Sequence, residues 1–141
     1  MSKIIMVQDI VEKKITLSEA KQMGIMHEGE IFSYFDEGLT RHVFANEDNT
    51  KVIKLEQSNI GTFNELEDKI YRNAKDEHKA KMAKTKLVNG FIEQEFVMPI
   101  KFGGIKLTMA QVRFATSCRN EVGFNKEGEL VCFDLDEYKK Y

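Results

Sequence analysis

The chain has 141 residues, of which 42% are hydrophobic and 31% charged, and its formal net charge is −2. This length suits one soluble domain with a core of its own, and no apolar run is long enough for a membrane span or a secretory signal. The slightly acidic balance argues against a protein that binds nucleic acid through general electrostatics.

The cysteines and histidines show no metal-binding pattern. Cys118 and Cys132 have no zinc-type spacing, and the three histidines are scattered. We expect Cys132, which lies in an apolar strand, to be a buried thiol. Two cysteines without a signal peptide favour a reducing compartment, so we expect the protein to be cytoplasmic.

The first expected element is a short helix that ends near Gly24. Thr16 and Glu19 have the capping-box spacing, and glycine suits the end of a helix. Residues 15–25 also look like the opening of a helix-turn-helix. Acidic residues follow in place of a basic recognition helix, and this argues against DNA reading.

Three antiparallel strands come next. Alternating apolar and polar residues separated by Asp-, Asn- and Gly-rich turns predict them at residues 30–35, 41–45 and 50–55. The third strand places Lys54 inside an apolar segment. Because an unpaired buried ammonium is very costly, Lys54 needs a partner or a ligand.

A long charged helix is expected from the capping box at 62–65 to about Lys84. Its apolar positions form one face at a period of 3.6 and are Phe63, Leu66, Ile70 and Ala74. At 100° per residue, Glu67 falls within that stripe. Two interpretations are open: Glu67 reaches water at the edge of the stripe, or it is buried as the partner of Lys54.

The last third of the chain predicts two hairpins and a short helix. The Asn89-Gly90 turn leads into a strand at 91–98, which Pro99 stops. After a flexible joint at 103–104, a short helix within 107–119 has Thr108 and Gln111 as a capping pair. A closing hairpin has strands at 122–124 and 130–133. Together the elements predict an α+β fold with a mainly antiparallel five-stranded sheet, one long helix, a short helix and a C-terminal hairpin.

This order of elements resembles the small lobe of the protein kinase fold, followed by the hairpin that carries the kinase metal-binding Asp. Val52-Ile53-Lys54 is similar to the family's V-A-I-K, and Glu67 is similar to the Glu that pairs with its Lys. Asp134 is similar to the Asp of D-F-G, and Asn120 precedes it by 14 residues, close to the family's spacing. The resemblance implies a nucleotide site at Gly38, Lys54 and Glu67, and a magnesium site at Asn120 and Asp134.

The domain organisation follows from the same resemblance. We expect one domain over residues 1–141, made of an N-terminal helical extension at 1–29, a kinase-small-lobe-like part at 30–100 and a vestigial large-lobe segment at 105–136.

Several kinase features are missing from the sequence. Of the Gly-rich loop only Gly38 remains, because Asp36 and Arg41 stand at the other two glycine positions. Ala115 stands where the family has its catalytic Asp. Asp136 replaces the glycine of D-F-G, and the five residues after it leave no helical lobe to hold a substrate.

These departures favour a protein without catalytic residues or a cofactor. The pattern is similar to small uncharacterised proteins of tailed bacteriophages, which implies a modulator or inhibitor of a host protein that works in the host cytoplasm. Met98 and Phe102 are the candidate partner-binding residues, from a Met-rich and aromatic set that also includes Met23, Met26, Phe32 and Tyr34. Exposed strand edges are also compatible with a homodimer. The alternative function is a phosphotransferase that binds ATP and magnesium.

Overall fold

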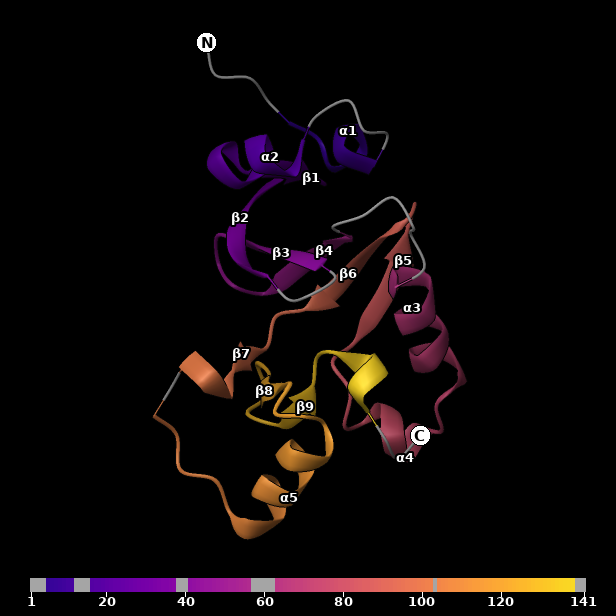
Figure 1. Cartoon of the computed structure of the whole chain (residues 1–141), viewed down its shortest axis with the longest axis vertical. Coiled ribbons are helices and arrows are strands. Elements are labelled where there is room, and N and C mark those ends of the chain that lie inside the picture. The colour runs from indigo at the N-terminus through magenta and orange to yellow at the C-terminus, as the bar shows by residue number, and fades with distance from the viewer. Residues whose placement is uncertain (1–4, 12–15, 38–40, 57–62, 103, 139–141) are drawn as a thin grey trace. The chain divides into compact units, whose positions relative to one another are not determined.

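The computed structural model describes residues 5–11, 16–37, 41–56, 63–102 and 104–138. The chain forms two compact units: a first unit of residues 1–65 and 86–94, and a second unit of residues 66–85 and 95–141. Figure 1 gives the order of the elements along the chain. The predicted α+β class with an antiparallel sheet is confirmed.

The first unit is built on a curled sheet with the strand order β1-β2-β3-β4-β6-β5. Its strands are β1 (Ile25–His27), β2 (Glu30–Glu37), β3 (Arg41–Asn46), β4 (Lys51–Glu56), β5 (Thr85–Val88) and β6 (Phe91–Glu95). The three consecutive strands predicted from alternation are confirmed, and so is the Asn89-Gly90 turn between β5 and β6. The five-stranded prediction is wrong, because the described residues form one sheet of six strands and another of three.

The strand missing from the prediction is β1, which is too short to show alternation. It pairs with β2 across a tight turn at Glu28 and Gly29, which both have positive φ, and the Met26 amide donates to Ile5 O at 2.7 Å. The bond to Ile5 depends on the fold and leaves no local pattern.

Two short helices, α1 (Val7–Val11) and α2 (Leu17–Met23), precede the sheet. Thr16 caps α2 as predicted, because its Oγ1 accepts the Glu19 amide at 3.2 Å. Gly24 ends the helix with φ +77°, a conformation that favours glycine. The helix-turn-helix interpretation is wrong, because β1 follows α2 where that motif has its second helix.

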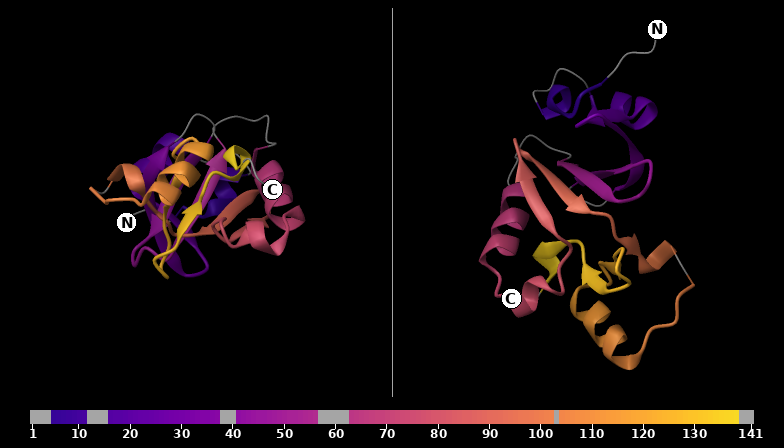
Figure 2. Two further views of the ribbon diagram at one scale, coloured as in Figure 1. Left: turned by 90° about the horizontal axis from the view of Figure 1, so that it is seen from below. Right: turned by 180° about the vertical axis from the view of Figure 1, so that it is seen from behind.

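The sheet of the first unit is curled (Figure 2). β1 and β6 are not neighbours in the sheet, yet the rings of His27 and Phe91 lie edge to face with centroids 5.1 Å apart. The buried apolar side chains of this unit's core are Ile5, Val7, Ile10, Ala20, Ile25, Phe32, Phe44, Ile53, Leu55 and Phe91.

The predicted long helix is wrong, because it stops at Asn73. Its segment contains α3 (Phe63–Asn73) and a separate turn, α4 (Asp76–Lys79). After α4 the chain pairs with β9: the Ala83 amide donates to Cys132 O at 2.8 Å, and the Cys132 amide donates to Lys81 O at 2.9 Å. This extended pairing outweighs the helical pattern of the sequence. Leu66 is also 45% exposed and does not belong to the buried face of α3.

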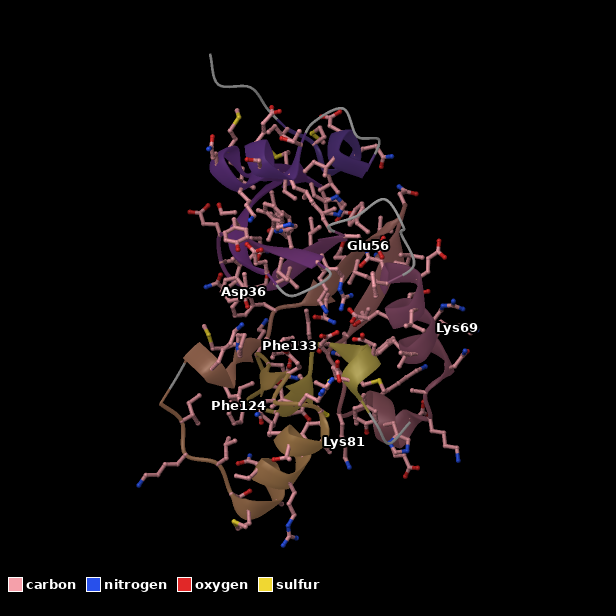
Figure 3. The ribbon with its side chains drawn as sticks, viewed as in Figure 1. Asp36, Glu56, Lys69, Lys81, Phe124 and Phe133 are labelled. Carbon is pink, nitrogen blue, oxygen red and sulfur yellow. The ribbon has the colours of Figure 1, made fainter. Side chains whose placement is uncertain are left out.

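The second unit contains a three-stranded sheet of order β7-β8-β9. Its elements are β7 (Met98–Pro99), β8 (Val122–Phe124), β9 (Leu130–Cys132), α5 (Met109–Ser117) and the 3₁₀ turns η1 (Ile100–Phe102) and η2 (Leu135–Glu137). The predicted strand at 91–98 is divided into β6 and β7. The closing hairpin is confirmed, with Phe124 in β8 opposite Leu130 in β9 and Phe133 just past β9 (Figure 3).

The predicted capping pair of α5 is also confirmed. Thr108 Oγ1 accepts the Gln111 amide at 3.2 Å, and Gln111 Oε1 accepts the Thr108 amide at 2.9 Å. The helix packs into the main core of the second unit, whose buried members are Ile70, Met82, Ala115, Cys118, Val122, Cys132, Leu135 and Tyr138. Among the described helices, none is long and apolar enough to cross a membrane.

Candidate functional site

Three carboxylates of the second unit converge beside η2. Glu67 lies on α3, and Asp134 and Asp136 lie on either side of Leu135. One oxygen from each carboxylate can be chosen so that all three lie within 4.8 Å of one another. We call these three residues the carboxylate cluster.

A backbone hydrogen bond holds the cluster together. Glu67 is 1% exposed, and its Oε2 accepts the Leu135 amide at 3.1 Å. Leu135 itself is fully buried, so both ends of this bond are fixed. The two aspartates therefore flank a backbone amide that is tied to the buried glutamate.

The electrostatics of the cluster favour a bound cation. Like charges at this separation repel one another. Asp136 Oδ1 is also buried and receives no hydrogen bond from the described residues. A buried acceptor without a donor is costly. Mg²⁺ takes oxygen ligands and is usually held by one or two carboxylates with waters, so this donor set fits a hard divalent cation.

The buried thiols beside the cluster are structural. Cys132 Sγ donates to Asp134 O at 3.2 Å. A hydrogen bond with the Cys118 thiol, together with burial, raises the pKa of Cys132. Because nucleophilic cysteine is the thiolate, this protonated thiol supports the backbone of the cluster. The prediction that Cys132 is a buried thiol is confirmed.

The structure tests the burial of two predicted site residues. Glu67 is buried, so the interpretation in which it reaches water is wrong. Lys54 in β4 is 3% exposed, as its apolar strand predicted. Lys54 belongs to the first unit and Glu67 to the second, and the pairing of their charges stays a prediction.

Asn120 lies between α5 and β8. It follows α5 with φ +63°, and its amide donates to Ala115 O at 2.7 Å. In the β8–β9 hairpin Val122 pairs with Cys132, and the Phe133 amide donates to Glu121 O at 3.1 Å. Asn120 and Asp134 each lie one residue beyond this bond, and their shared metal site stays a prediction.

Two of the remaining predicted positions lie outside the described part of the chain, namely Gly38 and the side chain of Phe102. Asp36 lies in β2 next to a bulge in the pairing with β3, and Arg41 begins β3. Ala115 lies inside α5 and is 2% exposed.

Sequence reasoning missed Asp136 as a member of the cluster. In the sequence Asp136 stands only at the position of the D-F-G glycine. The useful signal was the spacing of two aspartates around one apolar residue, which places both on the same tight turn when Leu135 is buried.

Several large apolar side chains of the described residues are exposed. Met98 is 38% exposed and Phe32 is fully buried, so only the former is available at the surface. A denser group lies on and just before α5, where Ile105 is 48%, Met109 69% and Val112 42% exposed. We call Ile105, Met109 and Val112 the α5 patch.

Comparison of the chain with models of known protein families found no match. Comparison with curated proteins also found none. The function is therefore inferred from the residues and their geometry.

Proposed function

We propose that this chain is a non-catalytic, kinase-like binding protein that acts by contacting another protein, a host protein if the chain is phage-encoded. The observation that carries this proposal is the position of Ala115. Phosphoryl transfer to a hydroxyl needs a carboxylate that accepts the proton. At the corresponding place this chain has a methyl group packed in the core of the second unit.

The kinase-like ancestry is part of the same proposal. It is supported by the order of three antiparallel strands, a helix with a buried Glu67, the β5–β6 hairpin and the β8–β9 hairpin that ends at Asp134. The buried Lys54 in β4 agrees with it. In this proposal the charges of Lys54, Glu67 and Asp134 support the fold and do no chemistry.

The contact surface that we propose is the α5 patch. Met109 and Val112 are three residues apart on α5 and share one helix face. Lys106 and Arg113 are exposed within the same segment, so the patch is apolar with a positive rim. Apolar anchors within a charged rim are typical of protein interfaces, and the sign of this rim favours an acidic partner surface.

The test is affinity capture with tagged full-length protein from a bacterial lysate. M109D and V112D should each lose the captured partner, because a charge at the centre of an apolar contact is desolvated without a counter-charge. I31D is the matched control, because Ile31 is 57% exposed in the first unit and lies outside the patch. Equal capture by all variants would refute this surface. Light scattering of the protein alone shows whether the partner is a second copy.

A second candidate function, ATP and magnesium binding, is favoured by the carboxylate cluster. In this alternative Glu67, Asp134 and Asp136 hold magnesium, and Gly38 and Lys54 are the phosphate residues that the kinase resemblance assigns. A ligand that binds only the folded state raises the melting temperature. Millimolar Mg·ATP should then stabilise the wild type by several degrees, D134N should lose the effect, and the turn variant E127Q should keep it. An unchanged melting temperature in the wild type removes this alternative.

A further inference from the structure

A second group of metal-ligating side chains lies in the first unit, far from the carboxylate cluster in sequence. His27 ends β1, Glu28 begins the turn to β2, and Glu93 lies in β6. His27 Nε2 is 3.1 Å from Glu93 Oε2 and 3.8 Å from Glu28 Oε1. One donor atom from each of the three side chains lies within 4.8 Å of the other two. The curl of the sheet creates this group, because β1 and β6 are not neighbours in the sheet.

The spacing of the donors fits a small tetrahedral ion. Zinc binds imidazole nitrogen and carboxylate oxygen at about 2.0–2.2 Å, which places two tetrahedral donors about 3.3 Å apart. The observed separations of 3.1 and 3.8 Å lie on either side of that value. Three protein ligands with one position left for water is also a common arrangement for zinc.

Two of the three donors are held in place before any ion binds. The His27 ring packs edge to face on Phe91 at 5.1 Å and contacts Phe32 at 6.1 Å between centroids. The side chains of His27 and Glu93 are only 13% and 14% exposed, whereas that of Glu28 is 59% exposed. The third ligand thus stands at the surface, where it can close on an ion that arrives from solvent.

The surrounding charges complement a divalent cation. Lys51 Nζ lies 3.9 Å from Glu93 Oε1 and 3.8 Å from Glu30 Oε2. The glutamates at 28, 30 and 93 exceed Lys51 by two negative charges. Lys51 also engages the oxygen of Glu93 that faces away from His27, so it orients the carboxylate as outer partners of metal ligands do.

From these contacts, distances and charges we propose that His27, Glu28 and Glu93 form a binding site for a divalent transition-metal ion such as zinc. The site is independent of the proposed function, since it uses only residues of the first unit. Imidazole with carboxylates suits zinc, whereas the all-oxygen carboxylate cluster of the second unit suits magnesium.

The experiment is calorimetric titration of the full chain with zinc chloride, after treatment with a chelator. The wild type should bind one equivalent, and zinc should raise its melting temperature. E28Q should bind at least about tenfold more weakly, the smallest loss typical of changes at metal-binding shells. Because Glu28 is an exposed turn residue, this variant tests the site without loss of a core contact. H27Q is the second variant and should show the same loss.

Two controls locate the effect. E47Q removes an exposed carboxylate from the β3–β4 turn and should bind zinc like the wild type. D134N changes the carboxylate cluster and should also bind zinc normally. The proposal is overturned if the wild type binds no zinc, if either E28Q or H27Q binds it unchanged, or if D134N abolishes binding.

Discussion

Gly123 occupies a position in the fold that tolerates no side chain. It lies in β8 opposite Pro99 of β7. A Cβ atom added to it would overlap the carbonyl oxygen of Met98, which is backbone and cannot rotate away. The β7–β8 pairing therefore depends on the absence of a side chain.

We expect Gly123→Ala to lower the free energy of unfolding by about 1–3 kcal/mol, the usual effect of an overpacked methyl group. Urea unfolding followed by circular dichroism measures it. Gly104→Ala is the matched control, because a Cβ there meets nothing within 4 Å. Equal midpoints for the two variants would contradict the close approach of β7 and β8.

His42 makes stability depend on pH. It is 8% exposed, and its Nδ1 is buried without a hydrogen bond from the described residues. Burial lowers the pKa of His42 below its usual 6.5, Lys21 lowers it further, and Glu37 partly opposes them. Below pH 6.5 the unfolded chain therefore binds a proton that the folded chain does not, so this contribution to stability falls as the pH falls.

The prediction is that His42→Gln reduces the loss of stability between pH 7 and about pH 5. Chemical unfolding at several pH values gives the slope for each protein. His78→Gln is the comparison, since His78 Nδ1 has a partner in the Tyr138 hydroxyl at 2.9 Å. If wild type and His42→Gln have parallel pH profiles, His42 is not the group responsible.

At the scale of elements, helix ends decide where α5 and α3 lie. The N-terminal cap of α5 is local, because Thr108 and Gln111 satisfy each other's backbone amides. The end of the helical region is set by a distant segment, because residues 81–83 pair with Cys132 instead of continuing a helix. The start of α3 is tied to the sheet: Asn64 Nδ2 donates to Lys54 O at 3.2 Å and to Gly90 O at 3.1 Å. Glu56, labelled in Figure 3, accepts the Asn64 amide at 2.9 Å.

Thr108→Ala should cost about 1 kcal/mol, the typical value for a lost threonine N-cap. The measurement is thermal unfolding, together with hydrogen exchange of the first amides of α5. Thr116→Ala changes an exposed threonine within the same helix and should leave both unchanged or slightly raised. A stable first turn in the Thr108→Ala variant would show that packing alone starts the helix.

At the scale of the whole molecule, each unit buries a hydrophobic cluster of its own. Phe32 and Phe44 are at the centre of the first cluster, and Leu135 and Tyr138 belong to the second. Removing a buried side chain from one cluster should therefore loosen the elements of that unit first.

Leu135→Ala should lower the free energy of unfolding by about 2–5 kcal/mol, as for other large-to-small core changes. Hydrogen exchange should show protection lost in α5, β8 and β9 before β2, β3 and β4. Met109→Ala is the control, because Met109 is 69% exposed and surface changes are small. Uniform loss of protection over both units would mean that the chain unfolds as one cooperative body.

Local signals of the sequence were sufficient for much of the fold. The caps at Thr16 and Thr108, the Asn89-Gly90 turn, the three central strands and the closing hairpin depend on residues close together in the chain, so they could be predicted. The burial of Lys54 also followed from its apolar neighbours in β4. For the candidate site, the helical period placed Glu67 within the apolar stripe of its helix, and the kinase resemblance indicated Asp134.

Only the tertiary structure decided the features that join distant segments. These are the bond of β1 to Ile5, the end of α3 at Asn73, the place of Asp136 in the carboxylate cluster and the approach of His27 to Glu93. Each depends on hydrogen bonds or side-chain contacts between parts of the chain that are far apart in sequence. The physical reason is that propensity and periodicity act over a few residues, whereas burial and backbone pairing are satisfied across the folded chain, which can override the local preference.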